Sequence, residues 1–84
     1  MPEYLVELYV PRTGAQDVRT AAGRARAAAE ELTREGTPVR YLRFIFLPED
    51  EMCFHLFDGP SADAVRLASE RAGLSPERIV QAAD

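Results

Sequence analysis

Two apolar segments joined by a short acidic turn constrain the fold of this chain more than any other feature. Residues 39–47 and 52–57 are dense in β-branched and aromatic side chains, and the intervening residues 48–51 read Pro-Glu-Asp-Glu. Segments of this composition, separated by a few turn-forming residues, are typical of a β-hairpin. The sequence therefore predicts a hairpin in the middle of the chain.

A strand and a helix are predicted before the hairpin. Residues 4–10 are dense in β-branched and aromatic side chains and stop at Pro11, which cannot donate to a ladder hydrogen bond. From about residue 16 to residue 35, alanines and larger apolar residues recur at spacings of three and four, which predicts a long amphipathic helix with a small-residue stripe. Gly36 is a natural residue to end that helix.

A second helix and a short final segment follow the hairpin. Ser61 is a good N-cap, Gly73 ends the helix, and Leu74 is placed for the apolar contact of a Schellman motif. Residues 78–81 could form a fourth strand or a last helical turn, and we favour the strand because it completes a βαββαβ order. The predicted fold is one α+β domain over residues 1–84, ferredoxin-like, with two helices on one face of a four-stranded antiparallel sheet.

Alternation along the strands divides their side chains into two sets. The set predicted to lie under the helices is almost wholly apolar: Tyr4, Val6, Leu8, Val10, Leu42, Phe44, Phe46, Met52, Phe54 and Leu56. The other set mixes large apolar groups with polar ones: Leu5, Glu7, Tyr9, Val39, Tyr41, Arg43, Ile45, Leu47, Cys53, His55 and Phe57. An uncovered face this apolar usually marks an interface, so we expect a homodimer of the α+β barrel type, paired through the open sheet faces.

The polar members of the second set are the candidate ligand-binding residues: Glu7, Tyr9, Tyr41, Arg43, Cys53 and His55. In a dry interface each polar group needs a partner, so Glu7 is expected to pair with Arg43, and Tyr41 or Tyr9 with His55. The cluster is compatible with three roles: a hydrogen-bonded interface network, a ligand or substrate pocket, or a metal site that uses the Cys-x-His spacing.

Bulk properties exclude several other classes. The net charge of −4 argues against nucleic-acid binding, and a single cysteine allows no internal disulfide. No apolar run is long enough for a membrane span, and the first residues lack a secretory signal, so a cytoplasmic location is expected. The acidic turn lacks calcium-loop spacing, and the motifs of the common catalytic classes are missing.

Several short motifs together resemble a family of small bacterial proteins with a ferredoxin-like domain of uncharacterised function, which includes a nickel-binding protein. They cover nearly the whole chain: Tyr4-Leu-Val-Glu7, Gly36-Thr-Pro-Val-Arg-Tyr-Leu-Arg43, Pro48-Glu-Asp-Glu-Met-Cys-Phe54, Pro60-Ser-Ala-Asp-Ala-Val65 and Arg71-Ala-Gly-Leu-Ser-Pro76. The resemblance implies the same fold and a dimer.

The resemblance also implies where metal ligands would lie. Metal-binding members have histidines near the end of the first strand and late in the second helix, where this chain has Leu8-Tyr9-Val10 and Leu67-Ala68-Ser69-Glu70. With His55 as the only histidine, a nickel site would have to use other ligands, such as Cys53 and carboxylates.

Three functional hypotheses remain, and the sequence names no cofactor for any of them. The first is a non-enzymatic homodimeric protein that binds a small molecule or a metal ion. The second is a cofactor-independent enzyme of the dimeric α+β barrel type acting on a hydrophobic substrate, with His55 as base and Arg43 stabilising an oxyanion in a cavity of at least ~300 Å³. The third is a pure interaction module.

Overall fold

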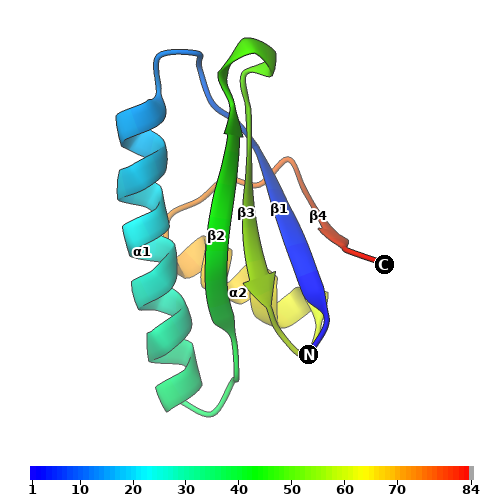
Figure 1. Ribbon diagram of the computed structural model, residues 1–84. Helices are drawn as coiled ribbons and strands as arrows, with labels where there is room; N and C mark the ends of the chain where they lie inside the picture. The colour runs from blue at the N-terminus through cyan, green and yellow to red at the C-terminus, as the bar shows by residue number, and fades with distance from the viewer. Residues whose placement is uncertain (84) are drawn as a thin grey trace.

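The computed structural model describes residues 1–83 and contains four strands and two α-helices in the order βαββαβ (Figure 1). The elements are β1 (Glu3–Tyr9), α1 (Ala15–Arg34), β2 (Arg40–Leu47), the short 3-10 helix η1 (Pro48–Asp50), β3 (Met52–Asp58), α2 (Ala62–Arg71) and β4 (Arg78–Gln81).

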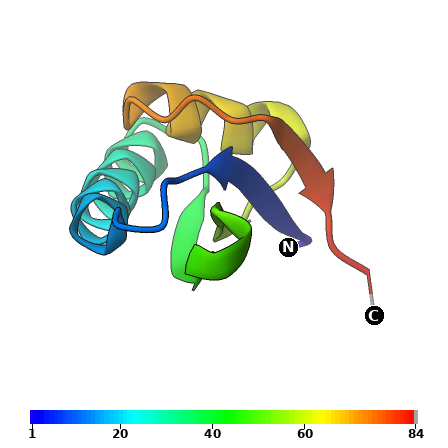
Figure 2. The ribbon, with the colours of Figure 1, turned by 90° about the horizontal axis from the view of Figure 1, so that it is seen from above.

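The four strands form one antiparallel sheet in the order β2-β3-β1-β4. Both helices lie on the same side of this sheet, and the opposite face carries no element of the described chain (Figure 2). The predicted ferredoxin-like α+β fold is confirmed, and residues 78–81 form a strand rather than a helical turn.

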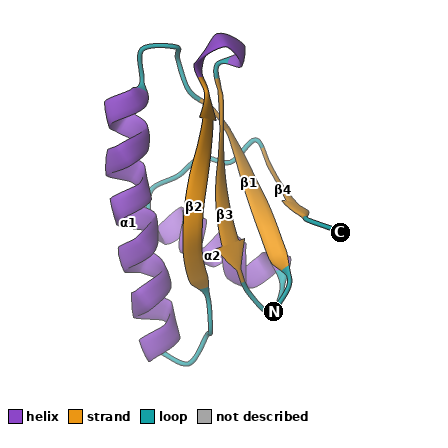
Figure 3. Ribbon diagram, viewed as in Figure 1, coloured by secondary structure: helices purple, strands orange, loops and turns teal. Residues whose placement is uncertain are grey.

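Local signals in the sequence set both ends of α2 and the end of α1 (Figure 3). Ser61 caps α2, since its Oγ accepts a hydrogen bond from the Ala64 amide at 3.2 Å. Both helices end in a Schellman motif at a glycine with positive φ, +105° at Gly36 and +78° at Gly73. At α2 the Leu74 amide donates to the Ser69 carbonyl at 2.9 Å, as this motif requires.

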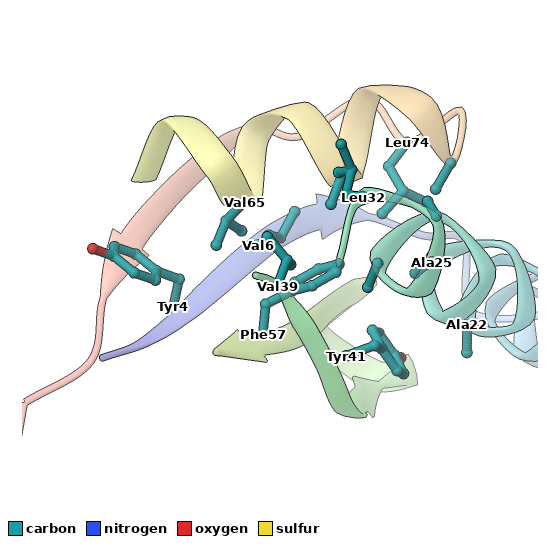
Figure 4. Packing of buried hydrophobic residues seen from close by; sticks show 14 of the residues in the cluster. Tyr4, Val6, Ala22, Ala25, Leu32, Val39, Tyr41, Phe57, Val65 and Leu74 are labelled. Atoms are coloured by element: carbon teal, nitrogen blue, oxygen red, sulfur yellow. The ribbon is translucent and has the colours of Figure 1, made fainter. Parts of the chain in front are cut away.

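The core lies between the helices and one face of the sheet (Figure 4). The buried stripe of α1 is the predicted one: Val18, Ala21, Ala22, Ala25, Ala28, Ala29 and Leu32. Alanines on this stripe bring the helix axis close to the side chains of Val6, Tyr41 and Phe57 below it. Arg24 joins the two helices, because its Nε donates to the Ala72 carbonyl at the end of α2, at 2.9 Å.

The predicted division of side chains between the two faces is right for β1 and wrong for β3. Tyr4, Val6 and Leu8 of β1 are buried in the core, and opposite them in β3 lie Phe57, His55 and Cys53. Directly opposite residues in a sheet share a face, so these β3 side chains point to the helices. Met52, Phe54 and Leu56 therefore belong to the open face.

A β-bulge in β2 changes which of its side chains face the helices. Tyr41 lies opposite Phe57, but the next paired residue is Arg43, opposite Leu56, so Leu42 is the extra residue. The bulge shifts the alternation by one residue. As a result Val39 and Tyr41 are buried in the core, contrary to expectation, whereas Arg43, Ile45 and Leu47 occupy the open face as predicted.

Neither helix in the described part of the chain is both long and apolar enough to cross a bilayer.

Candidate functional site

The six predicted site residues fall into two groups on opposite faces of the sheet. Tyr41, Cys53 and His55 lie in the core beneath the helices, and Glu7, Tyr9 and Arg43 lie on the open face. The expectation of one shared surface is wrong. The cause is the alternation of β3 and the bulge at Leu42, described above.

The three core residues form a linear series of hydrogen bonds in which His55 lies between Tyr41 and Cys53. The Tyr41 hydroxyl lies 2.8 Å from His55 Nδ1, and His55 Nε2 lies 3.8 Å from Cys53 Sγ. One tautomer satisfies every group: the tyrosine O–H donates to Nδ1, and Nε2–H donates to the sulfur. The predicted pairing of Tyr41 with His55 is thus confirmed. The His55 ring also contacts Phe44 edge-on, and both His55 and Cys53 are fully buried.

Burial keeps all three core groups uncharged at neutral pH. It lowers the pKa of His55 to about 4 and raises that of Cys53 to about 11. Burial likewise raises the pKa of Tyr41 to about 12, and the neighbouring Cys53 adds to that rise. A neutral, buried imidazole whose two nitrogens are both engaged has the properties of a structural residue.

On the open face, Glu7 pairs with a residue that was not predicted. Its Oε1 accepts a hydrogen bond from Arg78 Nε of β4 at 2.7 Å, so the expected Glu7–Arg43 pair is not formed. Arg43 lies on the edge strand β2 instead, three strands away from Arg78 in the sheet. Tyr9 is 61% exposed at the end of β1.

Two of the hollows in the described structure lie beside α1. The smaller, about 210 Å³, lies between α1 and the end of β1, and its lining includes Leu8, Tyr9, Val18 and His55. The larger, about 750 Å³, runs between the second half of α1 and the start of β2. We call it the α1–β2 groove; its charged and aromatic lining residues are Arg26, Glu30, Arg34, Arg40, Tyr41 and Asp58.

Comparison with known proteins gives the family. The sequence profile of a family described as nickel responsive protein SCO4226-like matches residues 4–81. The chain belongs to this family. A crystal structure of SCO4226 from Streptomyces coelicolor A3(2) superimposes with a TM-score of 0.80 at 20% sequence identity, covering 95% of this chain and 94% of that one. No curated protein sequence matches the chain.

The family description raises the question of whether these residues suit nickel. Within residues 1–83, no three His, Cys, Asp or Glu side chains gather closely enough to hold a metal ion. His55 and Cys53 are the softest donors, but each imidazole nitrogen already has a partner, and burial holds the thiol in its protonated form. The described residues of one chain therefore do not offer a donor set that fits nickel.

The arginines that line the groove were not among the predicted site residues. Arg26, Glu30 and Arg34 follow one another at spacings of four on α1, and by helical periodicity alone they belong to the solvent face. Their spacing showed that they share one side of the helix. Only the packing of α1 beside β2 shows that this side borders a groove.

Proposed function

We propose that this protein is a small homodimeric binding protein that pairs through its open sheet face. The observation that carries the dimer is the composition of that face, which no described element covers. Its accessible apolar members come from all four strands: Leu5, Ile45, Leu47, Met52, Phe54 and Val80, with Leu56 buried among them at 6% exposure. An apolar surface on this scale is unusual for a monomer in water.

The charged side chains on this face are placed so that dimer formation would not bury any of them without an oppositely charged partner. Across the sheet, one row reads Arg78, Glu7, Phe54 and Ile45, and the next reads Val80, Leu5, Leu56 and Arg43. Arg78 already pairs with Glu7, and Arg43 lies on an edge strand, where it can stay at the rim of an interface. The centre of the face is apolar.

The geometry supports a small organic ligand better than a metal ion or a catalytic role. The described residues of one chain offer no cluster of metal donors, whereas the α1–β2 groove, at about 750 Å³, has the size of a typical small-molecule site. The enzyme hypothesis needs a cavity of at least ~300 Å³ beside His55. The hollow that His55 lines is about 210 Å³, and the imidazole is fully buried.

The dimer is tested by molar mass in solution, measured by light scattering after size exclusion at tens of micromolar protein. We expect twice the chain mass of 9.3 kDa for the wild type. Leu47→Glu and Phe54→Glu should both shift the protein to the monomer, since each places a charge on the paired face. Leu47 is 39% exposed, so its replacement changes the interface with little effect on the core.

Leu67→Glu is the matched control, because Leu67 is also exposed, at 43%, but lies on α2 away from the sheet face. It should remain dimeric. A monomeric wild type, or a dimer that Leu67→Glu dissociates and Leu47→Glu does not, would contradict the proposed interface.

A further inference from the structure

The α1–β2 groove has walls that are fixed by hydrogen bonds. Thr33 of α1 bonds twice to Val39: its hydroxyl donates to the carbonyl at 2.8 Å and accepts from the amide at 3.1 Å. On the other side, Arg40 donates to Asp58 at 2.6 Å. The groove is therefore preformed, which reduces the entropy that a ligand loses on binding.

The floor of the groove is apolar and includes an aromatic ring. Val39 is 3% exposed and Tyr41 is 7% exposed, with Ala29 beside them. Figure 4 shows the Tyr41 ring beneath α1. The ring is held in place, because its hydroxyl bonds to His55 and it packs edge-to-face with the Phe57 ring at a centroid distance of 5.2 Å. Such a floor suits a flat apolar body.

The rim of the groove carries two arginine side chains that form no ion pair with the described residues. Asp58 is taken by Arg40, which leaves Arg26 and Arg34 with one carboxylate, Glu30, between them. Within residues 1–83, neither Arg26 nor Arg34 makes a side-chain hydrogen bond or an ion pair. The Arg26 guanidinium lies 5.1 Å above the centre of the Tyr41 ring, so the two contribute to one surface.

We infer that the groove binds a small organic monocarboxylate with a flat apolar body. The body lies against Val39 and Ala29, beside the Tyr41 ring that Arg26 covers, and the carboxylate pairs with Arg26 and Arg34. The fork of a guanidinium matches a carboxylate in two parallel hydrogen bonds. Glu30 disfavours a densely charged ligand such as a polyphosphate, because it adds a negative charge between the two arginines. This inference rests on the proposed binding function but not on the dimer.

The test is a titration of the ¹⁵N-labelled protein with 2-naphthoate, followed by amide chemical shifts. We expect saturable shifts in residues 26–41, and binding weakened about tenfold or more by Arg26→Gln or Arg34→Gln, since each loses a charge-assisted hydrogen bond. Glu30→Gln should tighten binding by removing the like charge. The neutral analogue 2-naphthamide should bind at least about tenfold more weakly than the acid.

Two controls separate failure of the groove from failure of the binding function. Arg66→Gln removes an exposed arginine of α2 outside the groove and should leave the affinity unchanged. Saturable shifts on the open sheet face, lost in Arg43→Gln but not in Arg26→Gln, would overturn the groove and leave a binding protein. If 2-naphthoate gives no saturable shift up to millimolar concentration, the monocarboxylate site is wrong, while the dimer is judged by its own test.

Discussion

At the scale of single residues, His55 shows how a polar side chain is accommodated in a core of this size. It is fully buried between Val6 of β1 and Phe44 of β2, yet both of its nitrogens have partners, Tyr41 and Cys53. A buried polar group with satisfied hydrogen bonds avoids most of the desolvation penalty as long as it stays neutral. The folded state therefore depends on the protonation of one imidazole.

This dependence predicts acid sensitivity with a defined sign. Burial lowers the pKa of His55 from 6.5 to about 4, so between these values the unfolded chain binds a proton that the folded chain does not. The stabilisation is fully present above pH 6.5 and is lost as the pH falls towards 4. The total loss of unfolding free energy from this one group is on the order of 3 kcal/mol.

Urea unfolding at several values between pH 7 and pH 4 measures this loss, and His55→Gln is the control because it removes the titrating group. The variant should start less stable and lose less stability across the window, leaving mainly the carboxylate contribution. Equal slopes for the two proteins would contradict a buried, neutral His55.

At the scale of elements, the glycines of the two helices give a matched pair of predictions. Gly23 lies on the exposed face of α1, and a Cβ added there meets nothing within 4 Å, whereas Gly73 ends α2 with φ +78°. Gly23→Ala should raise the unfolding free energy by up to about 1 kcal/mol, because alanine restricts the unfolded chain and favours helix. Gly73→Ala should lower it by about 1 kcal/mol, because a Cβ disfavours the left-handed region.

Thermal unfolding of both variants beside the wild type checks the pair. If Gly73→Ala stabilises the protein as much as Gly23→Ala does, Gly73 does not adopt the left-handed conformation with which the Schellman motif ends α2.

The elements also show where sequence reasoning works and where it stops. Proline, glycine and N-cap signals placed the first three strands and the two α-helices, because these residues act locally on the backbone. The last strand was favoured only because it completes the βαββαβ order. The two faces of β3 could not be separated by polarity, since both faces of this sheet are apolar. The pairing in the hairpin decides which face each β3 side chain occupies. Leu47 lies opposite Met52 across the turn, so the two share a face. Leu47 was predicted to lie on the open face, and Met52 therefore belongs there too.

The bulge at Leu42 is a different kind of miss. Nothing in the string Tyr41-Leu42-Arg43 resembles the glycine-containing bulges that a sequence can reveal. The bulge lets Tyr41 point into the core while Arg43 stays on the open face, so it results from the packing of both faces at once. It also explains why Tyr41 does not lie on the open face with Glu7, Tyr9 and Arg43, whereas Cys53 and His55 are in the core because of the alternation of β3.

At the scale of the whole molecule, membership of a nickel responsive family and the donor chemistry of this chain lead to different expectations. We predict that the purified protein, dialysed against micromolar Ni²⁺, retains less than one nickel per chain by elemental analysis, because the described residues of one chain hold no cluster of three donors. His55→Gln should behave like the wild type. One tightly held nickel per chain, lost in His55→Gln, would show that the core group opens to bind metal.

A dimer through the open sheet face would bring residues of two chains into close contact, and these contacts can be measured. In an equal mixture of ¹³C-labelled and unlabelled protein, an isotope-filtered NOE experiment detects only protons that are close across an interface. We predict intermolecular NOEs from the methyl and ring protons of Leu5, Ile45, Leu47 and Phe54, and none from Leu67 of α2. Intermolecular NOEs confined to the helices or to the strand edges, or none at all, would contradict the account.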